Sequence, residues 1–132
     1  MAATWTVLVA DDESLTRKMI RAMLERQLGL IVTEAADGRE ALEAYKQSHA
    51  DLVLLDADMP RLNGFEVCEK IRALEYGADV PILMVTSLAD SESARCAAAA
   101  GATDFVTKPI NWATLGRLIQ QHLPESRPAT AE

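Results

Sequence analysis

The chain has 132 residues, which suits one ordinary domain, and its 49% hydrophobic and 25% charged residues are typical of a folded globular protein. No apolar run approaches the roughly 20 residues of a membrane-spanning helix, and the N-terminal sequence lacks the basic region of a signal peptide, so we expect a cytoplasmic protein without a membrane partner. The net charge of −7 disfavours direct nucleic-acid binding and suits a protein that holds a cation or meets a basic partner.

Short segments rich in Val, Ile and Leu recur along the chain and predict β-strands. In chain order, the expected strands are residues 6–10, 30–35, 52–55, 81–86 and 104–106. Several of these segments are apolar at every position rather than at alternate positions. Strands that are buried on both faces of a parallel sheet have this composition.

Between the expected strands, apolar residues recur at the spacing of one helix face. The four stripes are Leu15, Met19, Met23 and Leu24; Ala41, Leu42 and Tyr45; Phe65, Val67, Cys68 and Ile71; and Leu115, Leu118, Ile119 and Leu123. The alanine-rich residues 91–100 are helical by propensity.

This fivefold alternation predicts an α/β fold, a flavodoxin-like doubly wound sheet of five parallel strands in the order 2-1-3-4-5 with five helices. Residues 1–123 are expected to form the domain. The polar residues 124–132 contain two prolines and are expected to form a disordered tail or the start of a linker.

Polar residues stand at the carboxyl ends of four expected strands. They are Asp11 and Asp12 after the first strand, Asp56 after the third, Thr86 at the end of the fourth and Lys108 after the fifth. The carboxyl ends of parallel strands meet at one edge of the sheet, so these residues are expected to converge. Each has an ordinary explanation alone, as a helix cap, a turn or a solvated charge, but packing does not explain all of them together.

A magnesium site with phosphoryl-transfer chemistry accounts for this set. Three converging carboxylates would repel one another, and Mg²⁺ removes that repulsion while keeping a phosphate oxygen and several waters as ligands. A carboxylate such as Asp56, beside a divalent cation, can attack phosphorus and form an acyl phosphate. Lys108 would supply a second positive charge to the phosphoryl oxygens, and Thr86 would donate a hydrogen bond.

Four sequence strings surround these residues: VADDE at 9–13, DADMPRLNG at 56–64, VTS at 85–87 and DFVTKP at 104–109. In this order they resemble the receiver domains of bacterial two-component response regulators, and the resemblance covers residues 5–123. It implies that Asp56 is the phosphoacceptor for a histidine kinase or a phosphotransfer protein. It further implies that Asp11, Asp12, Asp56 and the backbone carbonyl of Asp58 bind Mg²⁺.

The same resemblance assigns the remaining residues of the switch. Thr86 and Lys108 would bind the phosphoryl group, and the Lys108–Pro109 peptide bond would be cis. Phe105 would change position together with Thr86. The fourth helix, fifth strand and fifth helix would form the signalling face and a surface for a homodimer.

Three further expectations concern the output and the alternatives. The string KPINW at residues 108–112 resembles receivers placed ahead of cyclic-di-GMP synthesis and breakdown domains, which predicts a covalently linked output domain absent from this chain. A haloacid-dehalogenase-like phosphatase would use Asp56 and Asp58 as its D-x-D loop, but that family carries the motif on its first strand in a longer chain. The other alternative is a phosphate-independent interaction domain. We expect a signalling domain rather than an enzyme.

Overall fold

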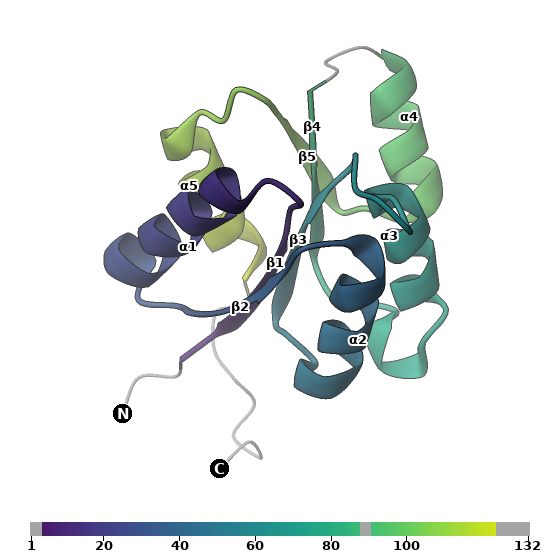
Figure 1. The fold of residues 1–132 in the computed structure, drawn as a ribbon, viewed down its shortest axis with the longest axis horizontal. Helices are drawn as coiled ribbons and strands as arrows, with labels where there is room; N and C mark the ends of the chain where they lie inside the picture. Colours follow the sequence, from purple (N-terminus) through teal and green to yellow (C-terminus); the bar gives the residue numbers. More distant parts are fainter. Residues whose placement is uncertain (1–3, 88–90, 124–132) are drawn as a thin grey trace.

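A five-stranded parallel sheet forms the centre of the molecule (Figure 1). Its strands are β1 (Thr6–Ala10), β2 (Ile31–Ala35), β3 (Leu52–Asp56), β4 (Ile82–Thr86) and β5 (Asp104–Thr107). The computed structural model describes residues 4–87 and 91–123, so the expected tail at 124–132 lies outside the described residues. The strand order is β2-β1-β3-β4-β5 and all four pairings are parallel, which confirms the predicted fold.

Five helices and one 3₁₀ turn connect the strands. They are α1 (Ser14–Leu28), α2 (Gly38–Ser48), α3 (Gly64–Arg72), η1 (Glu75–Gly77), α4 (Ser91–Ala100) and α5 (Trp112–His122). Helices α1 and α5 cover one face of the sheet, and α2, α3 and α4 cover the other (Figure 1). No helix in the described part of the chain is long and apolar enough to cross a membrane.

The two faces of the sheet bury separate apolar clusters. In β1, Val7 and Val9 face α1 and α5, whereas Leu8 packs in the cluster beneath α2, α3 and α4. Every residue of β3 and of β4 is buried, because these strands have a neighbouring strand on each side and helices on both faces. This double burial explains why their sequences are apolar throughout.

The predicted core stripe of α1 is wrong in its first half. Leu15 and Met19 are 69% and 46% exposed, and the residues that α1 buries are Ile20, Met23 and Leu24. At 100° per residue, Leu15 lies about 140° around the helix from Ile20, so both cannot face the sheet. The predicted stripes of α2, α3 and α5 each supply buried core residues.

Candidate functional site

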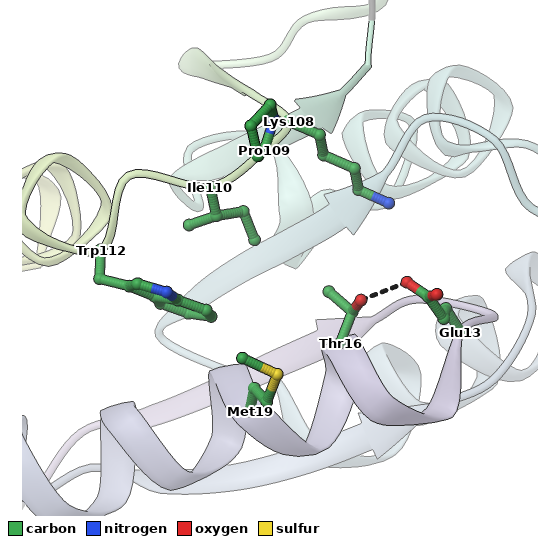
Figure 2. A pocket seen from close by; sticks show the side chains of 7 residues that line it. All are labelled: Glu13, Thr16, Met19, Lys108, Pro109, Ile110 and Trp112. Carbon is green, nitrogen blue, oxygen red and sulfur yellow. Dashed lines mark hydrogen bonds between the residues drawn. The ribbon is translucent and has the colours of Figure 1, made fainter.

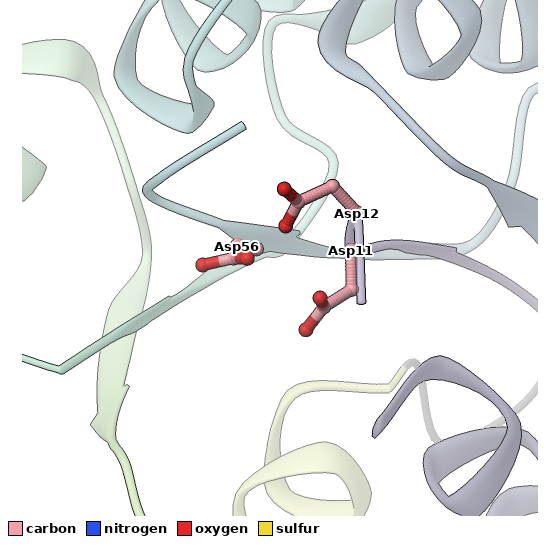
Figure 3. A group of neighbouring side chains, drawn as sticks. All are labelled: Asp11, Asp12 and Asp56. Atoms are coloured by element: carbon pink, nitrogen blue, oxygen red, sulfur yellow. The ribbon is translucent and has the colours of Figure 1, made fainter. Parts of the chain in front are cut away.

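Three aspartates converge at the carboxyl edge of the sheet (Figure 3). One carboxylate oxygen from each of Asp11, Asp12 and Asp56 lies within 4.8 Å of the others. Strands β1 and β3 are neighbours, and Ala10 pairs with Leu55, so the residues that follow these two positions lie side by side. Asp11 and Asp56 are buried, at 1% and 4% exposure, and Asp12 is exposed.

Lys108 reaches the same edge from the segment between β5 and α5. Its Nζ lies 3.4 Å from Asp56 Oδ2 and 3.5 Å from Asp11 Oδ2. Its backbone N–H donates to the carbonyl of Thr86 at 2.7 Å, which anchors the segment to the end of β4. The Lys108–Pro109 peptide bond is cis, as the resemblance implies. The predicted convergence of strand ends is therefore present in the structure.

The segment after Asp56 packs closely against the end of β3. The Asp58 N–H donates to Asp56 Oδ1 at 3.2 Å, and the Ala57 N–H donates to the carbonyl of Val85 at 2.7 Å. A Cβ at Gly64 would lie 2.4 Å from the Asp56 carbonyl oxygen, so this position has no room for a larger residue. Sequence reasoning identified Gly64 only as part of a motif and did not find this close approach.

Helix α3 begins immediately at this contact. Asn63 caps the helix, and its side chain accepts from the Glu66 N–H at 2.9 Å while the Glu66 carboxylate accepts from the Asn63 N–H at 2.9 Å. This reciprocal pair satisfies backbone donors at the start of the helix. The segment that carries Asp56 and Asp58 is therefore fixed at both ends, by β3 and by the helix cap.

The ionisation of the site reflects the excess of acids. Burial, and next the nearby Asp11 carboxylate, raise the pKa of Asp56 to about 6, although the Asp58 amide and Lys108 oppose this rise. Burial alone would lower the pKa of Lys108, but Asp56 and Asp11 raise it above its usual value. Three carboxylates and one ammonium leave two negative charges, which a divalent cation would balance. Oxygen ligands of this kind suit Mg²⁺.

Thr86 and Phe105 occupy neighbouring strands beside the site. Thr86 is buried at the end of β4, where it pairs with Thr107 of β5. Phe105 pairs with Met84 and is partly buried against the apolar cluster beneath α2, α3 and α4. Asp58 is exposed. All the residues predicted for the site therefore lie at one edge of the sheet or on the strands that end there.

A pocket of about 340 Å³ opens beside Lys108, between α1 and the start of α5 (Figure 2). Met19, Ile110 and Trp112 supply apolar side chains to it, and the Thr16 hydroxyl donates to the Glu13 carboxylate at its rim. Trp112 is partly buried, against the apolar cluster of this face.

Comparison with known proteins agrees with this geometry. Residues 7–120 match the family described as "Response regulator receiver domain". This chain belongs to the response regulator receiver family. Receiver domains are signalling domains of two-component systems, and the strand order described above is consistent with this family.

Two similar relatives differ in how much of their length the receiver covers. An uncharacterized 14.6 kDa protein of Leptolyngbya boryana is 37% identical and is matched over 91% of both chains. The probable transcriptional regulator ycf27 of Porphyridium aerugineum is 42% identical, over 80% of this chain but only 42% of its own length. The receiver thus corresponds to nearly the whole of the first relative and to less than half of the second.

Solved structures are similar over almost the whole chain. The chemotaxis protein CheY4 of Vibrio cholerae has a TM-score of 0.86 and 36% identity, covering 92% of this chain and 100% of that chain. The receiver domain of the sensor histidine kinase PA1611 of Pseudomonas aeruginosa has a TM-score of 0.83 and 34% identity, covering 91% and 98%. That domain was solved with a magnesium ion coordinated in its active site cleft.

Proposed function

We propose that this receiver accepts a phosphoryl group on Asp56 from a histidine kinase or a phosphotransfer protein. The observation that carries the proposal is the position of the Asp56 carboxylate. It is buried at the end of β3, its oxygens lie close to those of two other aspartates, and Lys108 is 3.4 Å away. A purely structural role would favour a paired carboxylate with a lowered pKa, whereas the pKa of Asp56 is raised to about 6.

The residues for a Mg²⁺ ion in this proposal are the side chains of Asp11, Asp12 and Asp56 with the backbone carbonyl of Asp58. The clustered carboxylate oxygens and the uncompensated negative charge support this assignment. When bound, Mg²⁺ would neutralise charge on the phosphoryl oxygens. It prefers a small number of carboxylate ligands and retains several waters, so the exposed Asp12 is a suitable ligand at the rim.

The transfer step in this proposal uses side chains that are already in place. A carboxylate oxygen of Asp56 forms the new O–P bond while the P–N bond of a phosphohistidine breaks, and the leaving imidazole takes up a proton. The Lys108 ammonium then interacts with a phosphoryl oxygen in place of its present contact with Asp56. The Thr86 hydroxyl, at the end of the adjacent strand, donates to another phosphoryl oxygen.

The signal in this proposal leaves the site through β4 and β5. Movement of Thr86 toward the phosphoryl group makes room for the ring of Phe105, which lies on the neighbouring strand. The surface formed by α4, β5 and α5 then contacts an output domain, a partner or a second copy of the chain. A cyclic-di-GMP output domain and a cytoplasmic location stay predictions, as does a domain boundary at residue 123, one residue after α5 ends.

One experiment tests the chemistry and separates the alternatives. The chain is incubated with acetyl phosphate and Mg²⁺ and its intact mass is measured. We expect one alkali-labile phosphoryl group per chain in the wild type and in Asp58→Asn, and none in Asp56→Asn, because an amide is a poor nucleophile. Turnover of phosphate esters without a stable adduct would instead support the phosphatase, and no adduct in any variant would support the interaction domain.

A further inference from the structure

Arg17 of α1 connects a surface ion-pair cluster with the backbone of the metal site. Its Nε donates to Glu34 Oε1 at 2.7 Å, and its Nη1 donates to the carbonyl oxygen of Asp11 at 2.7 Å. The two side chains are largely buried, at 13% exposure for Arg17 and 17% for Glu34. The other Glu34 oxygen accepts from Arg21 Nη1 at 2.7 Å, so Glu34 is held between two turns of α1.

The carbonyl that Arg17 contacts belongs to the peptide unit joining Asp11 to Asp12. The Asp11 N–H donates to the carbonyl of Ala35 at 3.1 Å, so both backbone groups of Asp11 have partners outside β1. Among the described residues, the Asp12 carboxylate has no hydrogen-bond or ion-pair partner. Its position therefore depends on the orientation of this peptide unit.

We propose that Arg17 is a positioning residue for Mg²⁺, and that it acts through the Asp11 carbonyl to set the direction of the Asp12 carboxylate. Glu34 in turn fixes the guanidinium by binding its Nε. This inference rests on the proposed function, because it assumes that Asp11 and Asp12 hold the ion. Partners behind the direct ligands commonly govern metal affinity by 10- to 100-fold or so.

Charge and position predict opposite results when Arg17 is replaced. The guanidinium is a positive charge near a cation site, so on electrostatic grounds its removal should strengthen Mg²⁺ binding. If Arg17 instead positions the ligands, its removal should weaken binding. The sign of the change therefore distinguishes the two roles when the variants are fully folded during the titration, because an unfolded fraction would also weaken apparent binding.

Calorimetric Mg²⁺ titrations of the wild type, Arg17→Met and Arg21→Met provide the test. Arg21→Met is the matched control, because it removes the same charge and the other guanidinium on Glu34 but no contact to Asp11. We expect the Mg²⁺ dissociation constant of Arg17→Met to rise about tenfold, and that of Arg21→Met to stay within about twofold of the wild type. Phosphorylation of Arg17→Met by acetyl phosphate should recover at saturating Mg²⁺.

The outcomes separate this inference from the proposed function. A wild type that binds no Mg²⁺ would overturn the proposed function. A wild type that binds Mg²⁺ together with an Arg17→Met protein that binds it equally well or more tightly would overturn the role of Arg17 alone. Equal weakening in both variants would also overturn it, because the effect would then act through Glu34 and not through Asp11.

If Arg17→Met does not fold, Arg17→Lys provides the same comparison. It keeps the positive charge but lacks the planar fork that binds Glu34 and the Asp11 carbonyl together. We expect weaker Mg²⁺ binding than in the wild type. Unchanged binding in Arg17→Lys would overturn the inference.

Discussion

Two charged clusters near the end of β1 have opposite balances of charge. Around Glu34, one carboxylate contacts the guanidiniums of Arg17 and Arg21, each at 2.7 Å. Around Asp56, three carboxylates lie together, and the ammonium of Lys108 contacts two of them, Asp56 at 3.4 Å and Asp11 at 3.5 Å. The first cluster has the close pairing of a structural ion pair, and the second has room for a further cation.

The ionisation of the two acids follows this difference. Hydrogen bonds from Arg21 and then Arg17 lower the pKa of Glu34, against a smaller opposing effect of burial. Burial and Asp11 raise the pKa of Asp56. A charged Glu34 therefore stabilises the fold, whereas a charged Asp56 destabilises the metal-free protein. Carboxylates on two strands of the same sheet thus have opposite effects on the stability of the metal-free fold.

Removing the Asp56 charge should have the largest effect on stability. Its pKa is about 6 when folded and 3.8 in an unperturbed chain, so ionisation costs the metal-free folded state up to about 3 kcal/mol above pH 6. Asp56→Asn should be more stable than the wild type by up to this amount at pH 7 in chelator, as measured by urea denaturation.

The pH dependence of that gain provides its control. Below about pH 3 the wild-type carboxyl is protonated in both states, so the difference between the two proteins should disappear. It should grow as the pH rises from 4 to 6 and then level off. Saturating Mg²⁺ should also reduce it, because only the wild type keeps all three carboxylates. A gain that is constant with pH would show that ionisation is not its cause.

Removing the ammonium of Lys108 should produce the next largest effect. Lys108→Met leaves the buried carboxylates of Asp11 and Asp56 without their shared cation, and metal-free stability at pH 7 should fall by about 2 kcal/mol. Thermal melting with and without Mg²⁺ measures this, and the metal should restore most of the loss. If Mg²⁺ stabilises Lys108→Met no more than the wild type, then Mg²⁺ and the Lys108 ammonium do not neutralise the same carboxylates.

Removing the charge of Glu34 should destabilise the protein, in contrast to removing the charge of Asp56. Glu34→Gln removes a carboxylate that is held by two guanidiniums, so stability at pH 7 should fall by about 1–2 kcal/mol. Since the pKa of Glu34 is lowered in the fold, its contribution is present at neutral pH and is lost as the pH falls through that pKa. Urea denaturation at pH 7 and in acid should show the two proteins becoming equal in acid.

A substitution that alters no charged group, Gly116→Ala, serves as the control for these measurements. Gly116 lies inside α5, and a Cβ there would meet no atom within 4 Å. Gly116→Ala should stabilise the protein by about 0.5–1 kcal/mol through helix propensity. The gain should be the same at all pH values and with or without Mg²⁺, in thermal melts. A dependence on either would mean that α5 is coupled to the site.

The fold and the position of the site could be predicted from the sequence because the buried strands are composed almost entirely of apolar residues. Strands such as β3 are enclosed on both faces and read as unbroken apolar runs, so the polar residues that follow them are conspicuous. Asp56, at the end of β3, is conspicuous in this way, whereas Lys108 follows the less apolar edge strand β5. The family resemblance then supplied the roles, which spacing alone does not provide.

Contacts made by charged residues on helices were beyond the sequence. Arg17 and Lys18 are neighbours of the same charge, yet Arg17 is largely buried against Glu34 while the Lys18 side chain is 64% exposed. Arg17 shares the buried helix face of Ile20 and Leu24, but the sequence does not show which side of α1 meets β2. The same reason explains the wrong prediction for Leu15 and Met19, whose helix face points away from the sheet.

The end of α5 lies beside the start of β5, as the 3.5 Å distance between His122 Nε2 and Asp104 Oδ2 shows. Eleven residues of helix span about 16 Å, close to the length of a five-residue strand, so α5 returns the chain across the full depth of the sheet. The beginning of β1 lies at that same amino edge (Figure 1). The start of β1 and the end of α5 thus both lie at the amino edge of the sheet, opposite the edge that carries the aspartates. A neighbouring module joined at either junction would leave the approach of a phosphodonor unobstructed.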